Sequence, residues 1–371
     1  LSEAVSDVMK AISTRTTIPI LTGMKIETTE EGLTLTGSNS EISIQRFIPL
    51  LHHDIQQVEI IEQGSIVLQA HFFADIIHKL PSETVEMTVQ ERQLTNILSG
   101  QAEFNLKGLD AEEYPRLPYI DEPNTFKVKA NDLRTVIKQT VFAVSDSETR
   151  PVLTGVQWKI ENEELRCVAT DSHRLAMSHV NVLDQTEKSS LPDVVIPGKS
   201  LTELAKLLAH HNEDVEVTVT ESQVLFKTKH TLFYSRLLEG KYPETSKLIP
   251  TDSKTMIELE RKPFLHAIER ASLLAKEEHN NVVKLVNDGE KRLEISSHSP
   301  EIGQVFEQIR PLSYQGDELK ISFSALFMLD ALKTIDSDTI TISFTGSMRP
   351  FLIRAADDPS ILQLILPVRT Y

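Results

Sequence analysis

The chain has 371 residues, a length that suits two or three domains, each able to bury a core of its own. No run of apolar residues is long enough for a membrane helix, no signal peptide is visible, and a single cysteine, Cys167, excludes an internal disulfide. We therefore expect a cytoplasmic protein without a membrane partner. The net charge of −16 argues against tight binding to nucleic acid, unless the basic residues gather on one surface.

In chain order, the first predicted elements are a helix over residues 1–15, a helix over residues 71–81 and a strand over residues 85–89. Apolar residues recur every three or four positions in the helices and every second position in the strand. Shorter alternating stretches between the two helices predict further strands. The same order of elements then returns twice.

A second copy follows at an offset of 132 residues, as the position of one short string shows. Residues 19–23 (Pro-Ile-Leu-Thr-Gly) fall in register with residues 151–155 (Pro-Val-Leu-Thr-Gly). The helices of this copy are predicted over residues 131–145 and 199–211. Its predicted strands include residues 126–129, before the first helix, and residues 215–219, after the second.

A third copy starts 132 residues further on, with weaker identity but the same pattern. Its helices are predicted over residues 261–276 and 324–335, and its strands include residues 256–259 and 340–344. The first copy lacks the strand that precedes the helix in the other two. We therefore expect that roughly eight to ten residues of native N-terminal sequence are missing.

The three copies predict an α+β protein of three similar domains, each with two helices packed on antiparallel sheets. Their period is longer than that of stacked solenoid repeats, so the copies are domains. Pro-containing stretches near residues 121–124 and 250–254 mark the boundaries. The expected domains are residues 1–121, 122–250 and 251–371.

The basic residues of this acidic chain gather in the predicted helices. The six helical segments together carry a net charge of +5, which leaves −21 on the rest of the chain. Lys and Arg are also good helix formers, so this enrichment alone has an ordinary explanation. However, Lys138 and Arg270 occupy the same position of the repeat, away from the apolar stripe, as expected of a helical wall that faces phosphates.

Five short strings give the chain a specific resemblance. They are TTIPIL (residues 16–21), ATDSHRLA (169–176), EGKYP (239–243), MRPF (348–351) and LPVR (366–369). Together they resemble the bacterial sliding clamp, the beta subunit of DNA polymerase III, over essentially the whole chain, and most of all the clamps of Gram-positive bacteria. The strings ATDSHRLA and LPVR are specific as a pair, whereas either one alone would be weak.

The resemblance implies a homodimer that closes head to tail into a ring around duplex DNA, a DNA clamp fold with its helices inside and its sheets outside. Such a protein is a processivity factor without catalytic activity, cofactor or metal. Its partners would be duplex DNA without sequence preference, a second copy of itself, the replicative DNA polymerase, the clamp loader and repair proteins. A linked ring needs only weak contacts to DNA, which would reconcile this function with the acidic net charge.

The resemblance also implies a groove between the second and third domains that binds short linear motifs of partner proteins. Its walls would be Leu153, Thr170, Ser172, His173, Arg174, Leu175, Pro243, Lys247, Leu248, Ser324, Phe327, Met348, Pro350, Leu364, Ile365, Leu366, Pro367, Val368 and Arg369. Arg174 and Arg369 would bond peptide carbonyls or acidic flanks. For the tail, the alternative is an ordinary final strand. Ser172 and His279 stand where the family usually has small or aromatic residues, so the ranking of partners could differ.

Two further sets of residues carry expected roles. Arg15, Lys10, Lys138, Arg150, Lys199 and Arg270 would face DNA, Arg15 by its match to a DNA-contacting position of the family. Phe104 and Leu106 of the first domain would pack against Leu273 and Leu274 of the third domain of the partner chain.

Two other functions compete with the clamp reading. Asp171 and His173 flank Ser172, and these residue types occur in hydrolytic and metal sites, but neighbours on a strand point to opposite faces and do not converge. The pairs His52-His53 and His210-His211 lack carboxylate or cysteine partners at ligand spacing. A scaffold protein that does not bind DNA is the other alternative. Retention on circular DNA with release after linearisation would exclude it.

Overall fold

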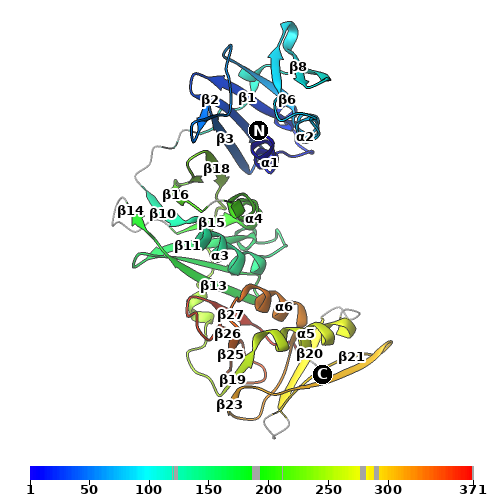
Figure 1. Ribbon diagram of the computed structural model, residues 1–371. Helices are drawn as coiled ribbons and strands as arrows, with labels where there is room; N and C mark the ends of the chain where they lie inside the picture. The colour runs from blue at the N-terminus through cyan, green and yellow to red at the C-terminus, as the bar shows by residue number, and fades with distance from the viewer. Residues whose placement is uncertain are drawn as a thin grey trace. The chain divides into compact units, whose positions relative to one another are not determined.

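The computed structural model describes residues 1–118, 120, 124–185, 193–210, 212–275, 281–287 and 292–369. Within these residues the chain forms six α-helices, two for each copy of the repeat (Figure 1). The helices are α1 (Ser2–Met9), α2 (Ala70–His78), α3 (Ala130–Thr140), α4 (Gly198–Leu207), α5 (Arg261–Ala275) and α6 (Ala325–Thr334). All six predicted helices are thus confirmed. None of the helices in the described residues is long and apolar enough to cross a membrane.

A nine-stranded antiparallel sheet combines the first copy with part of the second. Its order is β14-β10-β16-β17-β18-β3-β2-β1-β6. The strands are β1 (Gly23–Thr29), β2 (Gly32–Ser38), β3 (Ile42–Pro49), β6 (Gly64–Gln69), β10 (Thr125–Lys129), β14 (Asp184–Gln185), β16 (Asp214–Val219), β17 (Gln223–Lys227) and β18 (Thr231–Arg236).

A second nine-stranded antiparallel sheet combines the rest of the second copy with part of the third. Its order is β15-β11-β12-β13-β27-β26-β25-β19-β23. The strands are β11 (Gly155–Glu161), β12 (Glu164–Thr170), β13 (Arg174–Asn181), β15 (Val194–Pro197), β19 (Thr255–Glu260), β23 (Ser313–Gly316), β25 (Thr339–Phe344), β26 (Phe351–Ala355) and β27 (Leu362–Ile365).

The other strands of the described residues form three smaller sheets. A three-stranded sheet holds β7 (Glu86–Val89), β8 (Leu94–Ser99) and β9 (Ala102–Lys107). A four-stranded sheet has the order β22-β21-β20-β24, with β20 (Val282–Asn287), β21 (Leu293–Ser299), β22 (Gly303–Ile309) and β24 (Lys320–Ser324). The strands β4 (Leu51–His52) and β5 (Ile55–Gln56) pair only with each other. The five strands predicted from alternation correspond to β7, β10, β16, β19 and β25.

The helices bury one apolar stripe each, as their spacing predicts. In α5, Phe264, Ala267, Ile268 and Ala271 are buried, whereas Leu273 keeps 64% of its surface exposed. This face of α5 packs in one core with α6 and the strands of the third copy (Figure 1). Burial of such side chains is the main source of helix stability in a folded chain.

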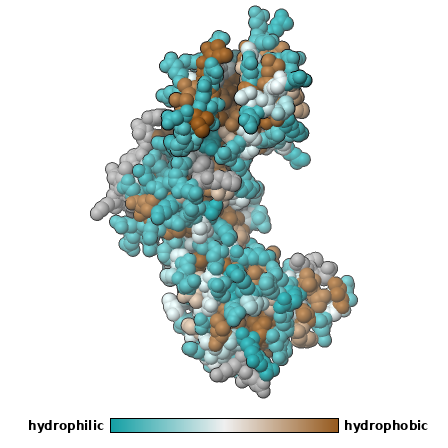
Figure 2. All heavy atoms as spheres, in the orientation of Figure 1, coloured by the Kyte–Doolittle hydropathy of each residue, from teal (hydrophilic) through white to brown (hydrophobic). Residues whose placement is uncertain are grey.

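The chain divides into two compact units that do not coincide with the three copies. One unit holds residues 1–130, 183–189 and 206–237, and the other holds residues 131–182, 190–205 and 238–371. Each nine-stranded sheet crosses from one copy of the repeat into the next, which gives a physical reason for this division. Figure 2 shows that the visible surface of both units is largely hydrophilic, with hydrophobic patches between the polar side chains.

The two crossings are formed in the same way. In the first unit, β3 of the first copy pairs with β18 of the second copy, with Ser43 opposite Tyr234. In the second unit, β13 of the second copy pairs with β27 of the third copy, with Leu175 opposite Leu364. Ser43 and Leu175 are separated by the repeat offset of 132, so the same edge of each copy receives the next one.

Candidate functional site

The loop between β12 and β13 carries the central part of the ATDSHRLA string. The Asp171 carboxylate accepts hydrogen bonds from the backbone N–H groups of His173 (2.8 Å) and Arg174 (3.0 Å). The Thr170 hydroxyl donates to the Arg174 carbonyl oxygen at 2.6 Å. Ser172 occupies the left-handed region at φ 78°, which non-glycine residues rarely adopt. Local bonds therefore hold this loop in one shape.

Arg174 lies at the centre of an ion-pair and aromatic cluster. Its Nε donates to Asp171 Oδ2 at 3.0 Å, and its Nη1 donates to Asp330 Oδ2 at 2.5 Å. The guanidinium lies over the ring of Phe327 (4.5 Å to the centroid) and that of Phe142 (5.4 Å). Only 12% of the Arg174 side chain is exposed. The arginine expected to bind a peptide is thus already bound by two carboxylates of its own chain.

Arg150 belongs spatially to the same loop. Its Nη2 donates to the Ser172 hydroxyl at 2.6 Å. This contact places Arg150, which was assigned to the DNA-facing set, beside the loop of the expected peptide groove. Arg150 and Ser172 are both exposed, so this bond lies at the surface of the loop.

The C-terminal segment adds the last part of the expected groove. After β27, the Leu366 N–H donates to the His173 carbonyl oxygen at 2.9 Å, and the Val368 N–H donates to the Ser322 carbonyl oxygen at 2.8 Å. The tail is thus bonded to the β12–β13 loop and then to β24. Residues 370 and 371 lie outside the described residues.

The expected groove residues differ in exposure. Leu153, Thr170, Leu175, Ser324, Leu364 and Ile365 are buried, Phe327, Arg174, Pro243, Pro350, Leu366, Pro367 and Val368 are half-buried, and Ser172, His173, Lys247, Leu248, Met348 and Arg369 are exposed. The exposed fractions are 51% for Leu248 and 53% for Met348. These two side chains and the half-buried apolar residues supply the accessible apolar surface of this set.

Two small hydrophobic clusters contain buried members of this set. Leu175 and Leu364 share one cluster, against which Leu366 packs. Leu153 packs with Tyr242, whose hydroxyl accepts from the Thr170 N–H at 3.1 Å. Burial raises the pKa of Tyr242, so this hydroxyl stays protonated at neutral pH. Tyr242 of the EGKYP string therefore binds Thr170 of the ATDSHRLA string.

The residues assigned to DNA contact are spread over both units, and several have acidic neighbours. Lys10 Nζ lies 2.7 Å from Asp7, Lys138 Nζ lies 3.6 Å from Asp336, and Arg270 forms a two-pronged ion pair with Glu307. The Arg270 bond lowers the pKa of Glu307. Arg15 and Lys199 are exposed. Pairing reduces the positive charge that these helices present, so Arg15 and Lys199 are the strongest remaining candidates.

The residues assigned to the ring interface lie at two sheet edges. Phe104 and Leu106 are on β9, which pairs only with β8 in the described residues. Leu273 and Leu274 lie on α5, which packs against β22, the edge strand of its sheet. Leu274 is half-buried and Leu273 is exposed. Each edge thus offers both backbone groups and apolar side chains.

The roles of several residues in the groove region could not be predicted from the sequence. Phe142 and Asp330, which hold Arg174, carry no signal in the sequence, because Asp330 lies 156 residues from Arg174. From its residue type alone, Asp171 is a candidate only for a hydrolytic or metal site. The structure instead engages its carboxylate with two backbone amides and Arg174. His279 and His211 lie outside the described residues.

Three family models match the chain. The N-terminal, central and C-terminal domains of the DNA polymerase III beta subunit match residues 1–118, 127–244 and 246–369. The beta sliding clamp of Bacillus subtilis is 58% identical over 371 residues, covering 100% of this chain and 98% of that protein. The chain belongs to the beta sliding clamp family.

Other clamps agree with this membership. The beta sliding clamp of Halalkalibacterium halodurans is 51% identical and covers 99% of this chain and 97% of that protein. The crystal structure of the Bacillus subtilis sliding clamp superimposes with a TM-score of 0.96 at 57% identity, covering 100% of this chain and 97% of that one. The Streptococcus pneumoniae DNA polymerase III beta chain gives 0.94 at 39%, with the same coverage. The resemblance predicted from five strings is confirmed, and neither the hydrolase nor the scaffold alternative receives support.

Proposed function

We propose that two copies of this sliding clamp close head to tail into a ring around duplex DNA and hold the replicative polymerase, the clamp loader and repair proteins there. In this proposal the clamp acts in the cytoplasm and catalyses no reaction. The observation that carries it is the repeated sheet junction, β3 with β18 and β13 with β27. The same junction is available once more, between chains.

The repeat identifies the strands that would form this third junction. β22 holds the place in the third copy that β3 and β13 hold in the first and second, because each is the third strand of a three-stranded antiparallel meander (β1-β2-β3, β11-β12-β13 and β20-β21-β22). β9 similarly holds the place of β18 and β27. In the described residues, β9 and β22 have one neighbour each. Pairing of β9 with β22 of a second copy would repeat the internal junction.

The side chains of the two edges suit such pairing. Along β9 and β22, half-buried and exposed residues alternate strictly. Phe104 and Leu106 are on the half-buried face of β9, and Val305 and Ile309 are on that of β22. A continuous sheet would put these apolar residues on one face, next to Leu273 of α5. Because β9 and β22 are different surfaces, the contact is heterologous, and two such contacts close a ring if the rotation is correct.

The groove proposal rests on apolar surface and on backbone groups from both copies. Leu248 and Met348 are exposed, and the loop carrying Ser172 and His173 meets the tail at the Leu366–His173 bond. Exposed aliphatic residues, together with the exposed basic residues Lys247 and Arg369, would suit an extended peptide with aliphatic and aromatic anchors. Micromolar affinity, about −8 kcal/mol, is the expectation for two or three such anchors.

The test is retention on DNA. Loaded clamp should stay on nicked circular DNA and dissociate when the circle is cut, because a linked ring leaves only by sliding off an end. Arg15→Ala should weaken direct DNA binding, and the binding of the parent should fall steeply with salt. Arg116→Ala, an exposed arginine of the same copy, is the matched control. Equal retention on circular and linear DNA would contradict the ring, and salt-independent binding would contradict an electrostatic lining.

A further inference from the structure

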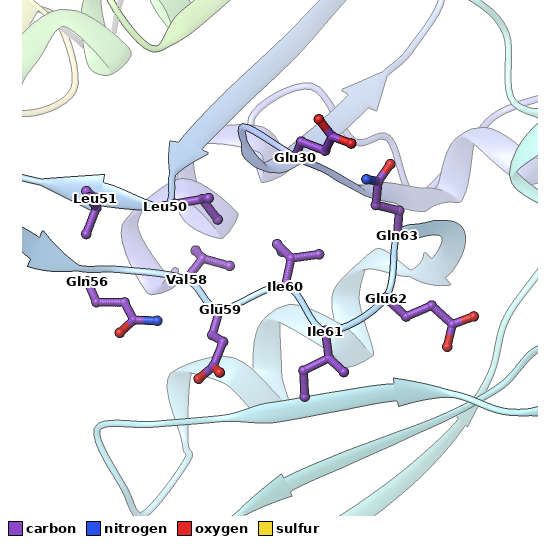
Figure 3. A pocket seen from close by; sticks show the side chains of 10 residues that line it. All are labelled: Glu30, Leu50, Leu51, Gln56, Val58, Glu59, Ile60, Ile61, Glu62 and Gln63. Carbon is purple, nitrogen blue, oxygen red and sulfur yellow. The ribbon is translucent and has the colours of Figure 1, made fainter.

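A second apolar surface lies on the first copy, at positions that neither the ring edges nor the peptide groove use. It is an open hollow of about 790 Å³ between the turn at Glu30 and residues 50–63 (Figure 3). Leu50, Val58 and Ile60 point toward its centre, and Ile61 extends from the same segment (Figure 3). We call this feature the hairpin hollow, because the segment includes the β4–β5 hairpin.

Large aliphatic side chains of this segment are exposed to an unusual degree. Ile61 keeps 90% of its surface accessible, Ile55 keeps 65% and Leu51 keeps 60%. Single exposed aliphatic residues are common on soluble proteins and need no explanation. Three in one short segment, beside an apolar hollow, are typical of an interaction surface.

One backbone hydrogen bond and one bond from a backbone N–H to a threonine hydroxyl hold the segment that lines the hollow. The Gln57 N–H donates to the Leu50 carbonyl oxygen at 2.8 Å, and the Gly64 N–H donates to the Thr28 hydroxyl at 2.9 Å. These bonds fix the two ends of the segment between them, so the hollow exists before any ligand arrives. A preformed site of this size accommodates a few side chains of a peptide.

All the charged residues that line the hollow are acidic. Glu30, Glu59 and Glu62 are among the ten residues that line the hollow, and none of the ten is Lys, Arg or His. In the described part of the chain, no ion pair engages these three carboxylates. They give a fixed negative potential around an apolar centre, and this combination selects ligands by charge as well as by shape.

We propose that the hairpin hollow binds a short basic segment, with two or more aliphatic or aromatic side chains, of a protein that acts on the encircled DNA. The glutamates repel nucleic acid and anionic membranes, and they attract the Lys- and Arg-rich segments that DNA-acting proteins carry. The apolar centre takes the side chains between the basic residues. The hairpin hollow thereby gives the clamp a docking point that is separate from the groove and does not depend on it.

The test uses a defined probe with the full-length protein. Fluorescein-labelled Lys-Leu-Lys-Val-Lys-Leu-Lys is titrated with the clamp and followed by fluorescence anisotropy. We expect saturable binding that Ile60→Ser weakens by roughly tenfold, because half-buried Ile60 would lose the aliphatic surface that the probe covers. Glu59→Gln with Glu62→Gln should also weaken binding and flatten its salt dependence. Both glutamates are exposed, so this second variant remains informative if Ile60→Ser fails to fold.

Matched controls separate site binding from general attraction to an acidic protein. Glu221→Gln with Glu260→Gln changes the net charge equally at exposed positions elsewhere, and Leu183→Ser removes an aliphatic side chain that is 45% exposed. Neither control should change the affinity. If the control glutamates matter as much as Glu59 and Glu62, the attraction is not local and the proposal fails.

Other occupants give distinguishable results. Growth of oligomers beyond the dimer that Ile60→Ser reverses would assign the hollow to a second copy of the chain and overturn the proposal. Competition by a Leu-Phe motif peptide would place the probe in the groove instead, with the same consequence. Retention on circular DNA should be unchanged in all hollow variants, so failure here and failure of the ring are seen in different assays.

Discussion

Arg174 and Asp330 join the second copy of the repeat to the third through an ion pair of 2.5 Å between Nη1 and Oδ2. Asp171 binds the same guanidinium, and Phe327 and Phe142 cover its faces. This arrangement satisfies a nearly buried charge, which would otherwise be costly. A peptide carboxylate that binds Arg174 would have to compete with Asp330.

Asp330→Asn should therefore have two separable effects. We expect unfolding free energy to fall by about 1–2 kcal/mol, less than for a fully buried pair, because 30% of the Asp330 side chain is exposed. A groove-binding peptide with an acidic flank should bind more tightly, whereas the same peptide with a Gln flank should be unaffected. Asp336→Asn, which removes an exposed partner of Lys138, is the control. Equal changes for both peptides would show that Arg174 does not contact the flank.

The ring interface is tested by removing one exposed side chain. Leu273→Ala should shift the protein toward monomer in sedimentation and shorten retention on circular DNA, because burying this leucine is worth roughly 1.5–3 kcal/mol. At 64% exposure it contributes little to its own fold, unlike half-buried Leu274. Leu183→Ala is a comparable exposed change. An unaltered dimer at nanomolar concentration would exclude the assigned interface.

Deletion of residues 367–371 should separate the groove from the ring. The deletion removes the Val368–Ser322 bond and leaves β27 and the Leu366–His173 bond in place. We expect peptide affinity, measured by isothermal titration calorimetry, to be lost while the dimer mass is unchanged. Affinity within twofold of the parent would show that the tail is only a closing segment.

The left-handed backbone at Ser172 predicts an unusual order of stability. Ser172→Gly and Ser172→Ala both lose the hydrogen bond to Arg150. Only Ser172→Gly also removes the backbone strain, which is about 1 kcal/mol. In urea unfolding, the glycine variant should thus be the more stable of the two. Exposed Ser6 within α1 should give the opposite order, because glycine is the poorer helix former. The same order at both positions would contradict the argument.

His230 predicts a loss of stability in acid. Burial, helped by Lys229, Arg46 and His52 and opposed by Glu213, lowers the pKa of His230 below its usual 6.5. The unfolded chain then binds a proton more readily, so this part of the stability is present above pH 6.5 and falls as the pH drops below it. His230→Asn should reduce the slope of unfolding free energy between pH 7.5 and acid. His71→Asn, at an exposed position, is the matched control variant.

The local spacing of apolar residues is enough to predict many of the helices and strands of this fold. Leu201, Leu204, Leu207 and Leu208 follow helical spacing and are all buried, and the β16 alternation is equally direct. The pairing of β3 with β18 could not be predicted from the sequence. Pairing between strand edges that are distant in the chain depends on the shape of the folded copies and not on the spacing of apolar residues. The ion pairs of Lys138 with Asp336 and of Arg270 with Glu307 could not be predicted either, because the carboxylates come from other elements of the fold.

The open edges of β9 and β22 have a consequence for the isolated chain. A molecule that presents two complementary, unpaired strands at different places is able to add further copies indefinitely, as a growing filament does. Closure after the second copy consumes both edges and ends that growth. Substitutions that alter the rotation between copies should therefore produce fibres rather than monomers, and the geometry that links the clamp to DNA would also protect it from aggregation.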